Sequence, residues 1–190
     1  MIINQTELDA CWSGKIGSPH DFLGLHEIGP GLGLVARALD PGADQVSLVD
    51  RSSDTLFPMN KIHPDGFFEA EILGKEEYFP YSFCSVHSGI EVDWQDPYGF
   101  LPHISNEELA QFNQGTDRRP YQKLGSFPTT KNGMDGVAFV VWAPSAQSVH
   151  LVGDFNHWRV NSLPMRSLGS SGCREIFVPG AQVGEKYKFR

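Results

Sequence analysis

One turn in the C-terminal half of the chain combines residue types that could bind a neutral polar ligand. Residues 153–158 read GDFNHW and directly follow a strand-like apolar run. Gly, Asp and Asn favour a turn there, because they tolerate positive φ or bond their own backbone. Just past the turn, Trp158 could present a flat apolar face, with the amide of Asn156 beside it as donor and acceptor. This pairing suits a sugar, whose C–H face packs on an aromatic ring while its hydroxyls need hydrogen-bond partners.

The same residues have a plainer explanation, which stays open. Tryptophan is on average highly buried, so Trp158 could simply cover the edge of a β-sandwich. Lys188 lies on the polar face of the last strand, where it could reach a ligand hydroxyl or only be solvated. We expect Trp142, inside an apolar strand, to lie in the core and Trp94 to pack the two halves together. Trp12, after a first helix, is expected to anchor that helix.

Nothing in the sequence indicates an active site or a metal site. The seven histidines show no metal-ligand spacing with cysteine or carboxylate, and the chain has no phosphate loop, nucleophile elbow or dinucleotide motif. Asp93 and Asp96 are close, but their Pro-rich setting indicates turns and caps. Cys11, Cys84 and Cys173 are far apart and odd in number, so we expect free thiols. We therefore expect no catalytic residue, no metal and no cofactor.

Charge and hydropathy exclude several partners. The net charge of −8 argues against nucleic acid or an anionic membrane as partner. The N-terminus lacks the basic and apolar regions of a signal peptide, and no run approaches the roughly 20 apolar residues that cross a bilayer. The expected location is the cytoplasm.

An internal repeat predicts the architecture. Residues 58–83 recur as 164–189 at an offset of 106, and residues 43–49 recur as 146–152 at an offset of 103. The first copy continues past Phe83, whereas the second runs into Arg190. A repeat of this length indicates two copies of one structural unit, and we expect the second copy to be incomplete.

These signals predict an all-β fold of two tandem immunoglobulin-like β-sandwich modules joined by a short helical connector. The expected divisions are a helical lead (1–17), a first sandwich (18–92), a connector (93–135) and a truncated second sandwich (136–190). In the connector, Ser105 and Glu108 form a capping-box pattern that predicts a helix start. Alternation over residues 68–72 predicts one buried and one wet face.

Seven motifs in order resemble the N-terminal region of bacterial glycogen branching enzymes, of glycoside hydrolase family 13. They are PHDFLGLHE (19–27), GFFEA (66–70), DPYGF (96–100), YQKLG (121–125), VWAPSA (141–146), GDFNHW (153–158) and FVPG (177–180). The resemblance implies enzymes that cut an α-1,4-glucan and reattach the piece through an α-1,6 bond. It implies two catalytic carboxyl groups on a barrel that follows a carbohydrate-binding module. We expect that barrel to be absent from this chain, which would leave it inactive alone, with α-glucan and the missing catalytic domain as partners.

Two positions depart from the family pattern, and three hypotheses remain. Arg174 stands where the family usually has tryptophan, and needs the sandwich rim or a partner. Arg159 and Val160 replace the family's Asp-Gly after the turn tryptophan. The chain is an N-terminal part of a branching enzyme, a free-standing non-catalytic glucan-binding or scaffolding β-sandwich protein, or a sandwich interaction module without a sugar role.

Overall fold

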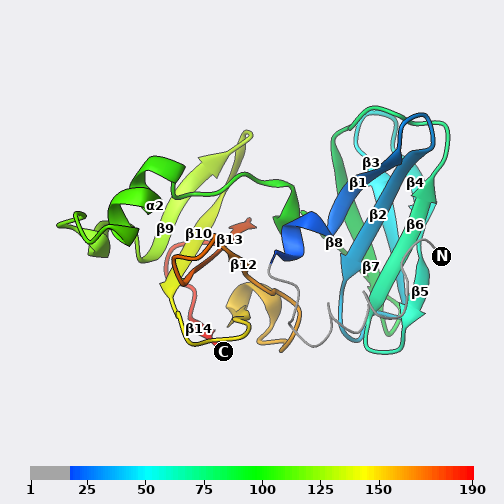
Figure 1. The fold of residues 1–190 in the computed structure, drawn as a ribbon. Coiled ribbons are helices and arrows are strands. Elements are labelled where there is room, and N and C mark those ends of the chain that lie inside the picture. The colour runs from blue at the N-terminus through cyan, green and yellow to red at the C-terminus, as the bar shows by residue number, and fades with distance from the viewer. Residues whose placement is uncertain (1–17) are drawn as a thin grey trace. The chain divides into compact units, whose positions relative to one another are not determined.

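A computed structural model describes residues 18–190, so the predicted helical lead, with Cys11 and Trp12, lies outside the described residues. The described chain consists mainly of antiparallel strands (Figure 1) and divides into two compact units, His20–Gly99 and Phe100–Arg190. The all-β architecture is confirmed, whereas the immunoglobulin-like strand order stays a prediction. No helix within residues 18–190 is long and apolar enough to span a membrane.

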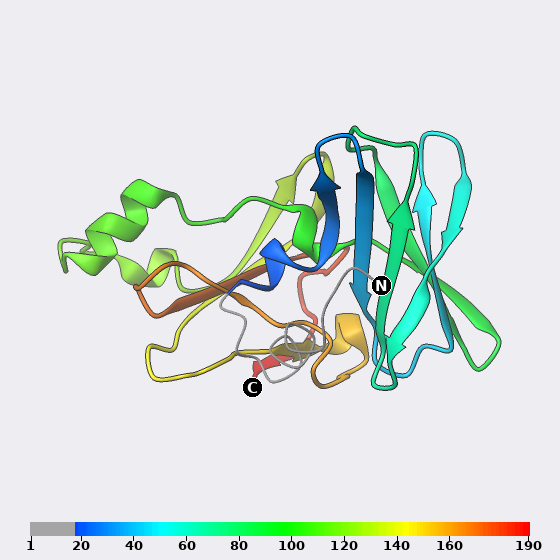
Figure 2. The same ribbon diagram turned by 45° about the vertical axis from the view of Figure 1, so that its right-hand side comes forward.

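The first unit is a sandwich of two four-stranded antiparallel sheets, which Figures 1 and 2 show as two layers. One sheet has the order β1 (Gly24–Gly29), β2 (Gly33–Leu39), β6 (Phe67–Ile72) and β5 (Asn60–His63). The other has the order β4 (Thr55–Pro58), β3 (Gln45–Asp50), β7 (Tyr81–His87) and β8 (Ile90–Trp94). Alternate side chains of facing strands fill the core between them, among them Leu34, Leu48, Phe68, Ile72 and Phe83.

The second unit is built around a longer sheet. Its order is β12 (Arg166–Ser167), β13 (Cys173–Pro179), β10 (Met134–Trp142) and β9 (Gly125–Lys131), and β11 (Leu151–Gly153) pairs separately with β14 (Tyr187–Phe189). The sequence predicts a connector over 93–135, but residues 125–131 form β9. The α-helix α2 (Asn106–Asn113) begins with the predicted capping box, in which the Glu108 amide donates to Ser105 Oγ at 3.3 Å. Four short 3₁₀ turns complete residues 18–190: η1 (Pro19–Asp21), η2 (Pro97–Gly99), η3 (Pro120–Gln122) and η4 (Asp154–Asn156).

The central strand β10 is covered on both faces, as its apolar sequence predicts. Residues 137–140 are all buried. On one face, the Phe139 ring packs edge-on against Tyr187 of β14, with 4.8 Å between centroids. On the other face, Val140 packs in a cluster with Leu109 and Phe112 of α2. The small sheet and the helix therefore lie on opposite sides of the longer sheet.

The sequence repeat is a repeat of strand register. Ala36 of β2 pairs with Ala70 of β6. The counterpart of Ala36 at an offset of 103 is Phe139, and that of Ala70 at an offset of 106 is Ile176; these two residues pair in the same way between β10 and β13. Long-range backbone hydrogen bonds recur as well. The Met59 amide donates to the Val46 carbonyl at 2.9 Å, and its counterpart Met165 donates to Val149 at 2.8 Å.

Each unit also buries a glutamate at the equivalent place. Glu69 is 4% exposed and pairs with Arg37 at 3.1 Å, while Glu175 is fully buried and pairs with Arg166 at 2.9 Å. The expected wet face of β6 is therefore wrong at Glu69 and holds only for the exposed Glu71. Burial is possible because an arginine on the adjacent strand, directly opposite in the register, neutralises each carboxylate.

Candidate functional site

The turn predicted at residues 153–158 is present and has an unusual backbone. It follows β11, passes through η4 and continues with His157, Trp158 and Asn161, whose φ values are 53°, 59° and 63°. Non-glycine residues rarely adopt positive φ, and three within five positions require that surrounding contacts hold them there. Such local strain is concentrated at functional sites in proteins.

Asn156 supplies the contacts that hold this turn. Its Oδ1 accepts from the Gly153 amide at 2.9 Å, and its Nδ2 donates to the Arg159 carbonyl at 3.1 Å and to Ser162 Oγ at 2.8 Å. The amide is thus already bonded on both its oxygen and its nitrogen within the turn. Asn156 therefore shapes the turn that carries Trp158.

Trp158 is 40% exposed, and its indole is fixed by an adjacent carboxylate. Trp158 Nε1 donates to Asp154 Oδ1 at 2.8 Å, while Asp154 Oδ2 accepts from the Lys186 amide at 2.8 Å. The hydrogen bonds from Lys186 and Trp158 hold the pKa of Asp154 below its usual range. With its N–H bonded, the ring offers a ligand only its apolar face and edges.

Lys188 lies on β14, the strand paired directly with the one that leads into the turn. Its register partner is Val152 of β11. Its side chain is exposed, while Tyr187 and Phe189 on either side are half-buried and packed against each other. The predicted alternation of this strand is confirmed, and Lys188 is accessible to a ligand.

The other residues that the sequence singled out have structural contacts. Arg174 is half-buried, and its Nη2 donates to the Ala146 carbonyl at 2.8 Å, which provides the partner that a charge there requires. Trp94 packs within the first unit, with 4.6 Å between its ring centroid and that of Phe83, and its Nε1 donates to Ser85 Oγ; its packing of the two halves together stays a prediction. The prediction for Trp142 is wrong, because this expected core residue is 55% exposed.

Asp96 is a buried carboxyl group whose pKa is raised. Burial raises its pKa from 3.8 to about 6, although Tyr81 Oη and the Tyr98 amide both donate to it. These bonds tie β7 to η2, so Asp96 does the turn and capping work that its setting predicts. Asp93 is exposed and pairs with Arg51 at 3.6 Å.

Sequence reasoning missed the buried cluster around Glu175. Its carboxylate accepts from the His103 amide at 2.7 Å and the Ile104 amide at 3.1 Å, besides Arg166. The only available signal was the offset of 106 from Glu69, which says nothing about burial. All partners here are main-chain amides and a paired arginine, so the cluster anchors the segment that leads into α2.

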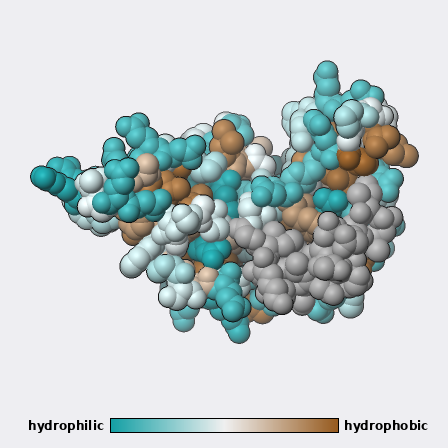
Figure 3. Space-filling view, viewed as in Figure 1, coloured by the Kyte–Doolittle hydropathy of each residue, from teal (hydrophilic) through white to brown (hydrophobic). Residues whose placement is uncertain are grey.

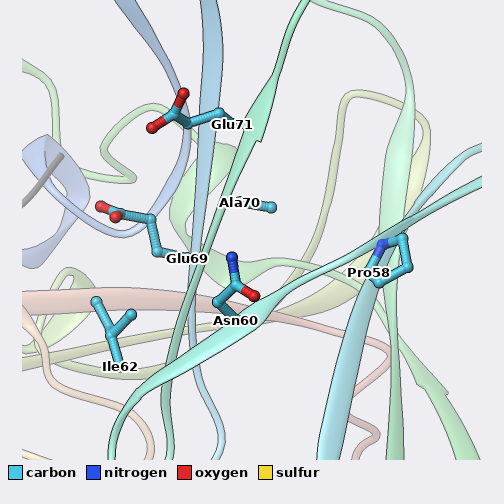
Figure 4. Close-up of a pocket in the computed structure, with 6 residues that line it drawn as sticks. All are labelled: Pro58, Asn60, Ile62, Glu69, Ala70 and Glu71. Carbon is cyan, nitrogen blue, oxygen red and sulfur yellow. The ribbon is translucent and has the colours of Figure 1, made fainter. Parts of the chain in front are cut away.

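A hollow of about 270 Å³ lies at β5 and β6 of the first unit. Its lining residues are Pro58, Asn60, Ile62, Glu69, Ala70 and Glu71, shown in Figure 4. There the two carboxylates point away from Pro58 and Ala70. Because Glu69 is already paired with Arg37, the hollow does not assemble a catalytic pair. No group of three or more potential metal ligands occurs in the described part of the chain.

The comparisons with known proteins agree with this division of the chain. Residues 123–190 match the family profile of carbohydrate-binding module 48 (isoamylase N-terminal domain), which is what most of the second unit is similar to. Residues 4–98, half of the chain, match the profile of the alpha-1,4-glucan branching enzyme GlgB, N-terminal domain. The chain belongs to that GlgB N-terminal domain family.

Similar curated proteins carry the same name. The chain is 36% identical over 197 residues to the 1,4-alpha-glucan branching enzyme GlgB of Protochlamydia amoebophila, and 35% identical over 190 residues to that of Roseobacter denitrificans. Both alignments cover 100% of this chain and 26% of the relative, so the chain spans about a quarter of their length. A solved pullulanase type I from Bacillus subtilis, complexed with maltose, aligns over 87% of this chain and 22% of its own, at 17% identity and a TM-score of 0.29.

Proposed function

We propose that this chain is a non-catalytic N-terminal region of a 1,4-alpha-glucan branching enzyme and binds α-glucan, as glycogen or maltooligosaccharide, through its second unit. The single observation that carries the proposal is the half-exposed indole of Trp158, fixed by Asp154 on a backbone that Asn156 holds at positive φ. A neutral polymer is also the ligand that a chain of net charge −8 can bind without repulsion.

In this proposal the pyranose face packs on the Trp158 ring and Lys188 donates to a sugar hydroxyl. Burying the exposed 40% of a tryptophan side chain of about 250 Å² removes roughly 100 Å² from water, or at most about 2.5 kcal/mol. Ordering the sugar offsets part of this gain, so binding at one such site is weak. Glycogen offers many equivalent chain ends per particle, which raises the observed affinity of a single site statistically.

Branching chemistry lies outside these 190 residues in the same proposal. A retaining mechanism needs two carboxyl groups about 5 Å apart. Among the described residues, the raised-pKa carboxyl of Asp96 is bonded to Tyr81 and to a main-chain amide, and Glu175 is bonded to Arg166. In the family reaction, the partner of this chain would be the catalytic domain of the longer enzymes. The chain would be located in the cytoplasm. An iodine-staining assay that detects branching by the purified chain would overturn this division.

Co-sedimentation with glycogen tests the binding proposal. The wild-type chain should pellet with glycogen, and Trp158→Ala should weaken the association about tenfold. Val160→Ala is the matched control, because Val160 is 42% exposed and lies close by in the same loop. Absence of wild-type pull-down would remove the glucan claim and favour an interaction module. Equal loss in both variants would show that the loop, and not the ring, matters.

A further inference from the structure

Trp142 is an exposed aromatic side chain on the opposite face of the unit from Trp158. It is the last residue of β10 and is 55% exposed. Phe139, three positions earlier, faces the small sheet and contacts Phe155 of the Trp158 turn at 5.4 Å between centroids. Because side chains alternate along a strand, Trp142 shares the α2 face with Val140. The two tryptophans therefore lie on different sides of the longer sheet.

The fold does not require exposure at this strand position. The equivalent residue of the first unit, at an offset of 103, is Leu39 at the end of β2. Leu39 is 8% exposed. The second unit thus places the largest apolar side chain where the first has a smaller, buried one. Exposure of the indole is therefore a feature of the second unit and not of the shared strand arrangement.

The indole is held in one orientation. Its Nε1 donates to the Ser171 carbonyl at 3.1 Å, and the Phe112 ring of α2 lies edge-on to it at 6.3 Å between centroids. The next residue, Ala143, donates its amide to the Gly172 carbonyl at 2.8 Å and closes the adjoining loop. A side chain fixed in this way stays exposed, and it presents a flat surface without loss of rotamer freedom on binding.

The size and surroundings of this surface fit a sugar better than a protein partner. An exposure of 55% of about 250 Å² leaves roughly 140 Å², below the several hundred Å² of an apolar protein-docking patch. On the face that Figure 3 shows, apolar side chains of the second unit lie in small groups among hydrophilic ones. Asn113 and Gln114, which directly follow Phe112 at the end of α2, are exposed polar residues.

We propose that Trp142 is a second α-glucan platform, which stacks on a pyranose ring independently of the Trp158 turn. This inference rests on the proposed function, since it takes glucan as the ligand. Two platforms on opposite faces do not share one short chain, so the second unit bridges two chains or branches of glycogen. Short maltooligosaccharides should then occupy two separate sites, while glycogen binding gains from both.

Calorimetric titration with maltoheptaose, combined with glycogen co-sedimentation, tests this arrangement. The wild-type chain should bind two maltoheptaose molecules, and Trp142→Ala or Trp158→Ala one each. Each single variant should lower glycogen affinity by roughly tenfold or more, and the double variant should abolish binding. Tyr121→Ala, at a side chain 70% exposed in the same unit, should change neither measurement.

The outcomes separate this inference from the proposed function. Loss of all binding in Trp158→Ala, with Trp142→Ala unchanged, overturns the second platform alone and leaves Trp142 to a protein partner. If the wild-type chain binds neither maltoheptaose nor glycogen, both the second platform and the proposed function are overturned. Trp142→Phe keeps an aromatic face and should retain two maltoheptaose sites. If Trp142→Phe and Trp142→Ala lose binding equally, and neither changes the melting temperature, stacking on the Trp142 ring is also contradicted.

Discussion

The buried carboxyl of Asp96 makes the stability of the first unit depend on pH in an unusual direction. Asp96 is 6% exposed, and burial raises its pKa from 3.8 to about 6. The folded chain therefore holds this proton more tightly than the unfolded chain does. Below pH 3.8 both states are protonated and the contribution is fully present. As pH rises from 3.8 to 6, the unfolded state releases its proton first and stability falls.

The magnitude follows from the size of the shift. A difference of roughly two pKa units corresponds to about 3 kcal/mol, of which about 1.3 kcal/mol falls between pH 5 and pH 7. Asp96→Asn removes the titration but keeps an oxygen that can accept from Tyr81. The free energy of unfolding of the variant, relative to wild type, should thus increase by about 1.3 kcal/mol from pH 5 to pH 7.

Urea denaturation of both proteins at the two pH values measures this difference, in which all other titrating groups cancel. Asp93→Asn is the control, because the Asp93 side chain is 63% exposed only three residues away. A relative stability that stays constant with pH for Asp96→Asn, or that changes as much for Asp93→Asn, would refute the reasoning.

Three further predictions concern residues that hold the second unit together. Glu175→Gln should lower the free energy of unfolding by about 3–5 kcal/mol, because it leaves the Arg166 charge buried without its carboxylate. Urea denaturation measures this loss, and an unchanged unfolding midpoint would contradict the prediction. Gly172→Ala should lower the melting temperature more than Gly169→Ala. Both have positive φ, but a Cβ at 172 would lie 2.7 Å from a proline ring, whereas 169 has open space. Asn156→Ala should weaken glycogen co-sedimentation at least as much as loss of the turn tryptophan, and full binding by this variant would show that the turn keeps its shape without the amide.

Local patterns predicted local structure well. The capping box of α2 forms between the two residues that carry its pattern, because it depends on groups three positions apart. The apolar run of β10 is buried on both faces, and the repeat offsets reproduce the strand register of both units. These features depend on periodicity and spacing, which the sequence states directly.

The errors arose where a partner far along the chain decides burial. Glu69 looked wet by alternation, but Arg37, 32 residues earlier, pairs with it. Trp142 looked buried by its apolar neighbours, but its ring is 55% exposed, and its contacts are with Phe112 and Ser171, both about 30 residues away in sequence. Asn156 stays a candidate binding residue, and the structure adds that its amide bonds within the turn itself. None of these contacts leaves a trace in local composition.

The sequence by itself therefore determined the all-β class, the two-copy organisation, the family and the place of the candidate sugar-binding turn. Strand periodicity, turn residues and repeated spacing are properties of short stretches, and each acts whatever the rest of the chain does. Only the tertiary structure decided which aromatic rings are exposed and which polar groups are already bonded. Exposure and hydrogen bonding depend on which segments meet in space, and that is how Trp142 joined Trp158 as a candidate platform while Asn156 became its support.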